Sequence, residues 1–161
     1  MRKDIRPDTS KLDKQINPFS YTLEIKLKQL ENTSSFTLEE GTLIHQTYTV
    51  EASPKVSLYV KSEHRLIHNN LFSCAKELLL WILYTLETNT DYIWINKLRY
   101  MKETSTTINT YKKAIDNLER YGFLVSTSIK DTYWINPEFF FRGDRKNKYP
   151  DKCIVEITKK D

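Results

Sequence analysis

The chain has 161 residues, of which 29% are charged and 39% apolar, and its net charge is +4 at pH 7. This length suffices for one domain with a small appendage, and no apolar run approaches the ~20 residues of a membrane span. The start lacks the apolar stretch of a secretory signal, and the two cysteines make neither a disulfide framework nor a zinc pair. We therefore expect a cytoplasmic protein with no membrane partner.

The positive charge is concentrated in one part of the chain. Residues 97–152 carry 12 Lys and Arg against 7 Asp and Glu, whereas the rest carries 13 against 14. A surface that contacts a nucleic-acid backbone needs such an excess. This part of the chain is therefore the first place to look for a DNA-binding surface.

Two segments precede that part. Residues 1–17 alternate basic and acidic side chains with few apolar ones, which predicts a flexible, solvated arm; alternatively, its basic residues, among them Arg6, could reach a DNA backbone. Residues 18–62 predict a small antiparallel β element, because apolar and polar side chains alternate from Tyr21 to Lys28.

Further strands of this element are expected at about 42–51 and 55–61, the second with Val56, Leu58 and Val60 inward. An exposed sheet edge can pair with a second copy of the chain. A homodimer is therefore one assembly that the sequence allows.

Residues 63–161 predict a winged helix-turn-helix domain with a basic C-terminal extension. A helix is expected from 74 to 86, with Ser73 as its N-cap. Its apolar residues recur every three or four positions, and Leu80, Trp81 and Tyr84 widen the apolar surface, so the helix should be largely buried.

The next elements follow in the order of a winged helix. Residues 91–96 are too short and too rich in aromatic and β-branched residues for a helix, and we expect a strand that pairs with the wing. Residues 97–103 predict a short second helix with Leu98 and Met101 inward.

The segment from 106 to 121 is predicted as the recognition helix. Ser105 or Thr106 can cap its start, and Gly122 fits a left-handed position after its end, with Phe123 packing back on the last turn. At 100° per residue its apolar and polar residues separate onto two sides. The buried side should hold Ile108, Tyr111, Ala114, Ile115, Leu118 and Tyr121, and the exposed side Asn109, Lys113, Asn117 and Arg120.

Residues 123–128 and 132–136 predict two short strands around a tight turn, which form the wing. The aromatic run 139–141 should anchor the tail to the core, before a basic cluster at Arg142, Arg145, Lys146 and Lys148 and a final strand at 153–157. The predicted fold class is therefore α+β, a winged helix-turn-helix domain preceded by a small antiparallel β-sheet.

Three stretches carry a family resemblance: SCAKELLLWILYTLETNTDYIWIN, INTYKKAIDNLERYGFLVST and YWINPEFFFRGDRKNKYP. The chain resembles the winged-helix replication proteins of plasmids and phages, the RepL-type initiators, over roughly residues 55–149. The most specific part is the asparagine-proline step at 136–137, directly after the wing. The resemblance implies a MarR-like winged fold in a bacterial host cell, binding to a replication origin, recruitment of host replication proteins and no enzymatic activity.

The leading hypothesis is sequence-specific binding to double-stranded DNA. Thr106, Asn109, Thr110 and Lys113 are expected to reach base edges, where Asn can pair with adenine and Lys with guanine. Phosphate contacts are expected from Lys112, Asn117 and Arg120 on the helix, Lys130 on the wing, and Arg145 and Lys146 beyond it.

Two other functions stay open: a winged-helix transcriptional regulator, and an interaction or assembly module that does not bind DNA. An enzyme is not expected, because the sequence has no nucleophile pair and no phosphate-cradling glycine loop. His64 and His68 lack a recognisable third ligand. We therefore predict no catalytic residue, cofactor or metal.

Overall fold

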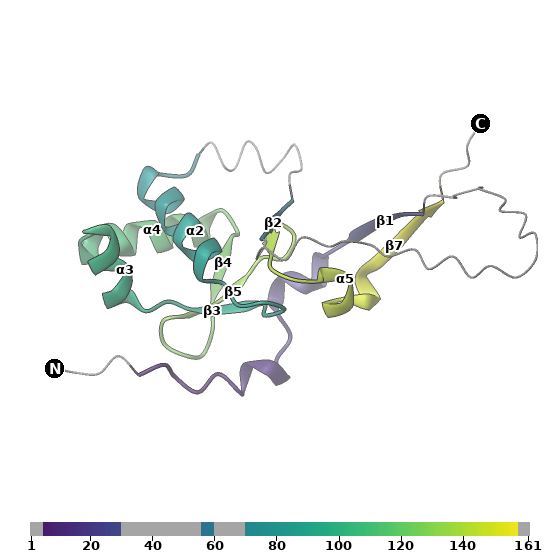
Figure 1. The fold of residues 1–161 in the computed structure, drawn as a ribbon, viewed down its shortest axis with the longest axis horizontal. Coiled ribbons are helices and arrows are strands. Elements are labelled where there is room, and N and C mark those ends of the chain that lie inside the picture. Colours follow the sequence, from purple (N-terminus) through teal and green to yellow (C-terminus); the bar gives the residue numbers. More distant parts are fainter. Residues whose placement is uncertain (1–4, 30–55, 60–69, 158–161) are drawn as a thin grey trace, which may run out of the picture.

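The structure, a computed structural model, describes residues 5–29, 56–59 and 70–157. The helices α2, α3 and α4 lie together beside small β-sheets, and β1 and β7 extend away from α3 and α4 (Figure 1). In chain order the helices and strands are β1 Ile25–Gln29, β2 Ser57–Leu58, α2 Ser73–Thr85, β3 Tyr92–Trp94, α3 Lys97–Thr104, α4 Ile108–Arg120, β4 Leu124–Ser126, β5 Thr132–Ile135, β6 Phe140–Phe141, α5 Arg145–Lys148 and β7 Cys153–Ile157.

The α+β class is confirmed, and the order from α2 to β5 is that of a winged helix. β5 lies between β3 and β4 and is antiparallel to both. The predicted strand before α3 therefore joins the wing, with Tyr92 opposite Trp134.

The core lies between α2, α4 and this sheet. α2 contributes Ala75, Leu78 and Ile82, which are fully buried, and α4 contributes Ala114 and Leu118. The aromatic run 139–141 is buried as well, which confirms that it anchors the tail. The apolar periodicity of α2 and α4 thus identified the centre of each packing face.

Several side chains of α2 and α3 differ from the prediction. α2 has Phe72 rather than Ser73 at its N-cap, without a side-chain cap. Leu80 and Tyr84 are 66% and 81% exposed, because α2 is packed from one side only by the described residues. In α3 the fully buried side chain is Tyr100, whereas Leu98 is 55% exposed.

The N-terminal segment packs on the wing sheet, where a solvated arm was expected for residues 1–17. Leu12 is 1% exposed and forms a small apolar cluster with Tyr92 and Trp134. The Asn17 amide donates to the carbonyls of Asp91 and Ile135, at 3.2 and 2.9 Å. Leu12 and Asn17, together with the hydrogen bond from the Tyr92 hydroxyl to Asp13, hold in place a segment whose average composition is polar.

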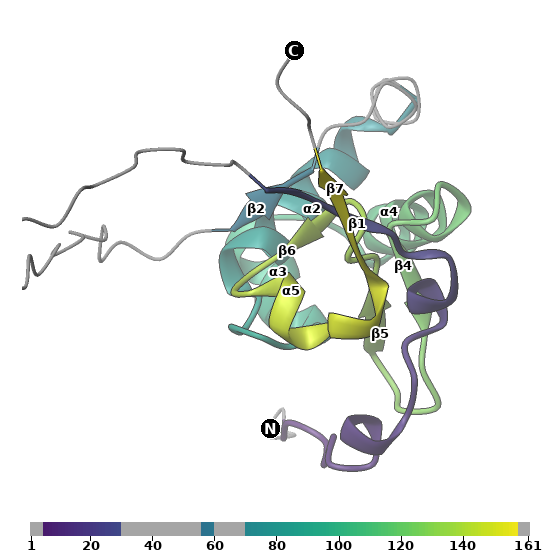
Figure 2. The same cartoon turned by 90° about the vertical axis from the view of Figure 1, so that its right-hand side faces the viewer.

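The pairing of β1 also differs from the prediction. β1 pairs with β7 in parallel, with Ile25 opposite Cys153, rather than within an antiparallel N-terminal sheet. Figure 2 shows the two strands side by side. β2 instead pairs antiparallel with β6, and Leu58 is 59% exposed rather than inward.

The predicted strand at 42–51 and the pair His64 and His68 lie outside the described residues. The pairing of β1 with β7 joins the segment expected at 18–62 to the segment expected at 63–161. Because the partners are more than a hundred residues apart in the chain, no local pattern could have predicted it.

Candidate nucleic-acid interface

α4 begins two residues later than the sequence suggested. The Thr107 hydroxyl caps it by accepting a hydrogen bond from the backbone N–H of Thr110 at 3.3 Å. Ser105, predicted as a cap, instead ends α3 in the left-handed region at φ 54°. Thr106, the other predicted cap, accepts a hydrogen bond from the Thr104 hydroxyl at 2.8 Å, within the turn between the two helices.

The end of α4 is as predicted. Gly122 has φ 74°, and its N–H donates to the carbonyl of Glu119 at 3.1 Å. The N–H of Phe123 donates to the carbonyl of Leu118 at 2.9 Å. These two bonds make a Schellman motif, which ends the helix and turns the chain into the wing.

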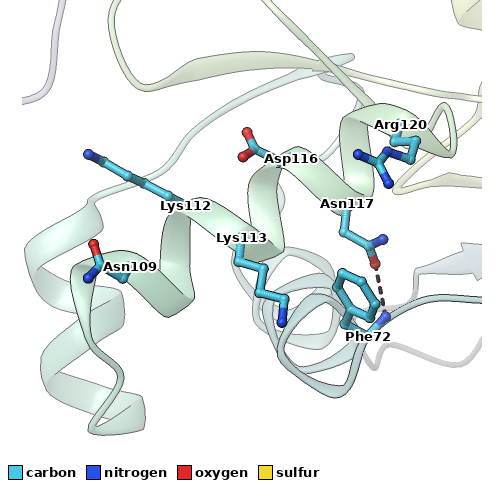
Figure 3. Close-up of a pocket in the computed structure, with 7 residues that line it drawn as sticks. All are labelled: Phe72, Asn109, Lys112, Lys113, Asp116, Asn117 and Arg120. Atoms are coloured by element: carbon cyan, nitrogen blue, oxygen red, sulfur yellow. Dashed lines mark hydrogen bonds between the residues drawn. The ribbon is translucent and has the colours of Figure 1, made fainter.

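The outer face of α4 is open to solvent and rich in polar side chains. Asn109, Lys112, Lys113, Asp116 and Arg120 are exposed on it. With Phe72 and Asn117 they line a shallow hollow of about 300 Å³, here called the α4 hollow (Figure 3). On this face three cations outnumber one carboxylate, Asp116, so the surface is suited to a polyanion.

Asn117 does not belong to the exposed set in which the sequence placed it. Its side chain is 3% exposed, and its Oδ1 accepts the backbone N–H of Phe72 at 2.9 Å. The 100° rule places position 117 at the border of the buried face, and the start of α2 covers that border. Asn117 therefore joins α4 to α2, and a phosphate contact from it is no longer proposed.

Lys113 is also engaged by the start of α2. Its Nζ lies 4.7 Å from the centre of the Phe72 ring, a cation–π contact. Figure 3 shows Lys113 turned toward Phe72 and Lys112 turned away from it. This contact draws the Lys113 ammonium away from the N-terminal end of α4, where it was expected to reach bases.

The wing turn carries Lys130 in an exposed position. Within the turn, the Thr127 hydroxyl accepts the N–H of Ile129 at 3.0 Å, and Asp131 has φ 55°. The turn projects toward the same end of the molecule as α3 (Figure 1). Lys130 is therefore displayed by a turn with its own hydrogen bonds, as a wing contact requires.

Arg145 is part of the packing rather than of an open basic surface. Its guanidinium lies 3.5 Å from the centre of the Tyr59 ring and donates to the carbonyl of Pro137 at 2.8 Å. Burial lowers the pKa of this guanidinium from its usual value. Lys146 is exposed, but α5 lies at the other end of the molecule from α3 (Figure 1).

Buried and half-buried aromatic residues of α3, α4 and β5 pack on the inner side of α4 and add no charge. Tyr111 packs against Tyr100 with ring centres 5.7 Å apart. Burial raises the pKa of the Tyr111 hydroxyl above its usual value, and burial likewise raises the pKa of Tyr133. Both phenols stay neutral at physiological pH, so the charge of this region comes from its surface side chains.

The sequence prediction missed two contributors to this face. Phe72 was given no role from the sequence, yet it forms one wall of the α4 hollow. Ile108 was assigned to the buried side of α4 but is 39% exposed. Its position within the polar first turn, at the edge of the apolar stripe, was the available signal.

Two further observations concern other kinds of site. The described residues contain no group of His, Cys, Asp and Glu side chains that could hold a metal ion. Among the same residues, every helix is too short or too polar to cross a membrane.

Comparison with known proteins gives one match. The family model described as Firmicute plasmid replication protein (RepL) matches residues 64–156, which include every helix and strand from α2 to α5 and most of β7. Neither the search of curated proteins nor that of solved structures returned a match.

Proposed function

We propose a function from one premise: this chain belongs to the RepL family of Firmicute plasmid replication proteins. The proposed function is initiation of plasmid replication by sequence-specific binding to double-stranded DNA, with recruitment of host replication proteins to the bound origin. The observation that carries it is the open outer face of α4, which exposes Asn109 in the first turn and Lys112, Lys113 and Arg120 farther along the helix.

The proposal assigns α4 to the major groove, whose width admits one α-helix. Asn109 and Thr110, in the first turn, are the candidates for base edges. Lys112 and Arg120 on α4 and Lys130 on the wing are the candidates for phosphates. Thr106 is assigned to the turn before α4 rather than to a base contact, because its hydroxyl already accepts a hydrogen bond from Thr104.

The first test is fluorescence anisotropy of the protein across a salt series. One duplex has random sequence, and the other carries the DNA that flanks the gene of this protein. We expect salt-sensitive binding to both, because phosphate contacts release counterions, and tighter binding to the flanking DNA. No retention of either duplex at low salt would overturn the proposal in favour of an interaction module.

Two variants separate base reading from phosphate contact. Asn109→Ala should lose ~1–3 kcal/mol on the preferred duplex and little on the random one. Lys130→Ala should weaken both duplexes alike and reduce the salt slope by about one unit. Equal loss on both duplexes for Asn109→Ala would contradict the assignment to bases.

Replication is tested in cells, with a circular DNA that carries the bound region and has no other origin. We expect it to persist only when the wild-type protein is supplied, and to be lost with Asn109→Ala. Specific DNA binding without persistence would instead support the transcriptional-regulator alternative.

A further inference from the structure

The first turn of α4 differs chemically from the rest of its outer face. Thr107, Ile108, Asn109 and Thr110 are all exposed, and none carries a charge. The cations begin one turn later, at Lys112. The part of the helix that leads into a groove therefore presents an amide and aliphatic groups.

The hydroxyls of this turn are already engaged. The Thr107 and Thr110 hydroxyl oxygens are 3.0 Å apart, and Thr107 also caps the helix through the N–H of Thr110. A threonine whose hydroxyl is bonded to its own helix still offers its methyl group to a partner. In the same turn the Ile108 side chain is 39% exposed, although the helix has a buried stripe for such residues.

Asn109 is the exception among the polar groups. Its amide has no hydrogen-bond partner among the residues that the structure describes. At 100° per residue it lies between Ile108 on one side and Thr110 on the other. The Asn109 amide, a free donor and acceptor, therefore shares the exposed first turn with an aliphatic group about 100° round the helix on each side.

These groups match one kind of base pair. In the major groove adenine offers a donor and an acceptor side by side, which one amide satisfies, and thymine offers a C5-methyl group. Guanine offers two acceptors, which call for a cation, but Lys113 is held at the Phe72 ring. The first turn has the chemistry for adenine and thymine and lacks that for guanine.

We propose that the first turn of α4 reads A·T base pairs, with Asn109 on adenine and the methyl groups of Ile108 and Thr110 on the C5-methyl of thymine. This inference deepens the proposed function and rests on it. It names the recognised DNA as a site whose central contacts are A·T pairs, and it makes Ile108 and Thr110 specificity-determining residues.

The test begins with selection of bound duplexes from a random library. Each thymine of the selected site is then replaced singly by uracil, which pairs identically and lacks only the methyl group. We expect A·T pairs at the contacted positions. We also expect about a fourfold loss of affinity at one or two uracil positions, the factor that corresponds to one buried methyl group.

Two variants test whether the loss of affinity with uracil arises from contacts with Ile108 and Thr110. Thr110→Ser removes the methyl group and keeps the hydroxyl bonded to Thr107, and Ile108→Ala removes the other aliphatic group from an exposed position. At the thymine that the replaced side chain contacts, each variant should bind the thymine and the uracil duplex equally. Its circular dichroism spectrum should remain that of the wild type. Lys112→Ala, the control, should weaken both duplexes by the same factor.

The outcomes separate this inference from the proposed function. Absence of any salt-dependent DNA binding would refute both the inference and the proposed function. Tight, selective binding to a site with G·C pairs at the contacted positions, or with no cost of uracil anywhere, would overturn the inference and leave the proposed function standing.

Discussion

Asn109 and Asn117 are the same residue type on the same helix, two turns apart, with opposite environments. Asn109 is exposed and its amide is free within the described chain, whereas Asn117 is 3% exposed and bonded to the backbone of Phe72. The sequence assigned both to DNA because both follow the polar side of the helical repeat. Their difference arises from α2, which covers one border of α4.

At this scale we predict that Asn117→Ala lowers the free energy of unfolding by about 1–3 kcal/mol, since the part-buried N–H of Phe72 loses its acceptor. Asn109→Ala, the matched control, should change it by less than about 0.5 kcal/mol because the site is exposed. Urea denaturation followed by tryptophan fluorescence measures both. Equal stability of the two variants would refute the packing role of Asn117.

At the scale of elements, the wing sheet is covered on both faces. α2 and α4 lie on the core side, and on the other side Leu12 packs with Tyr92 and Trp134, next to Phe19, Val125 and Ile129. The N-terminal segment therefore completes the support of the wing. A wing built only of three short strands would be marginal by itself.

We predict that Leu12→Ala destabilises the wing by about 2–5 kcal/mol, the usual cost of truncating a buried leucine. Hydrogen exchange should accelerate in β4 and β5 more than in α2. Ile16→Ala, in the same segment but at a residue that is 64% exposed, is the control and should leave exchange unchanged. Unaltered exchange in the Leu12 variant would mean that the segment does not support the wing.

The basic side chains that the sequence predicted to contact DNA lie in two separate parts of the molecule. α4 and the wing carry Lys112, Arg120 and Lys130 toward one end, and α5 carries Lys146 at the other (Figure 1). One straight duplex laid along α4 and the wing would leave α5 outside the contact. If the duplex lies this way, we expect the basic C-terminal extension to make no contact with DNA.

Accordingly, Lys146→Ala should leave both the affinity for DNA and its salt slope unchanged, whereas Lys130→Ala reduces the slope. Anisotropy titrations at several salt concentrations compare the two variants directly. A lower slope for Lys146→Ala would mean that DNA bends around the molecule or that a second site exists near β7.

The sequence by itself determined the order of the winged domain, the packing faces of α2 and α4 and the glycine stop at Gly122. Each of these follows from spacing within one or two turns of chain, where periodicity and backbone preference act. Only the tertiary structure decided the pairing of β1 with β7, the burial of Leu12 and the separate environments of Asn109, Lys113 and Asn117. These depend on which distant segment covers a given side chain, and local residue patterns do not predict that segment.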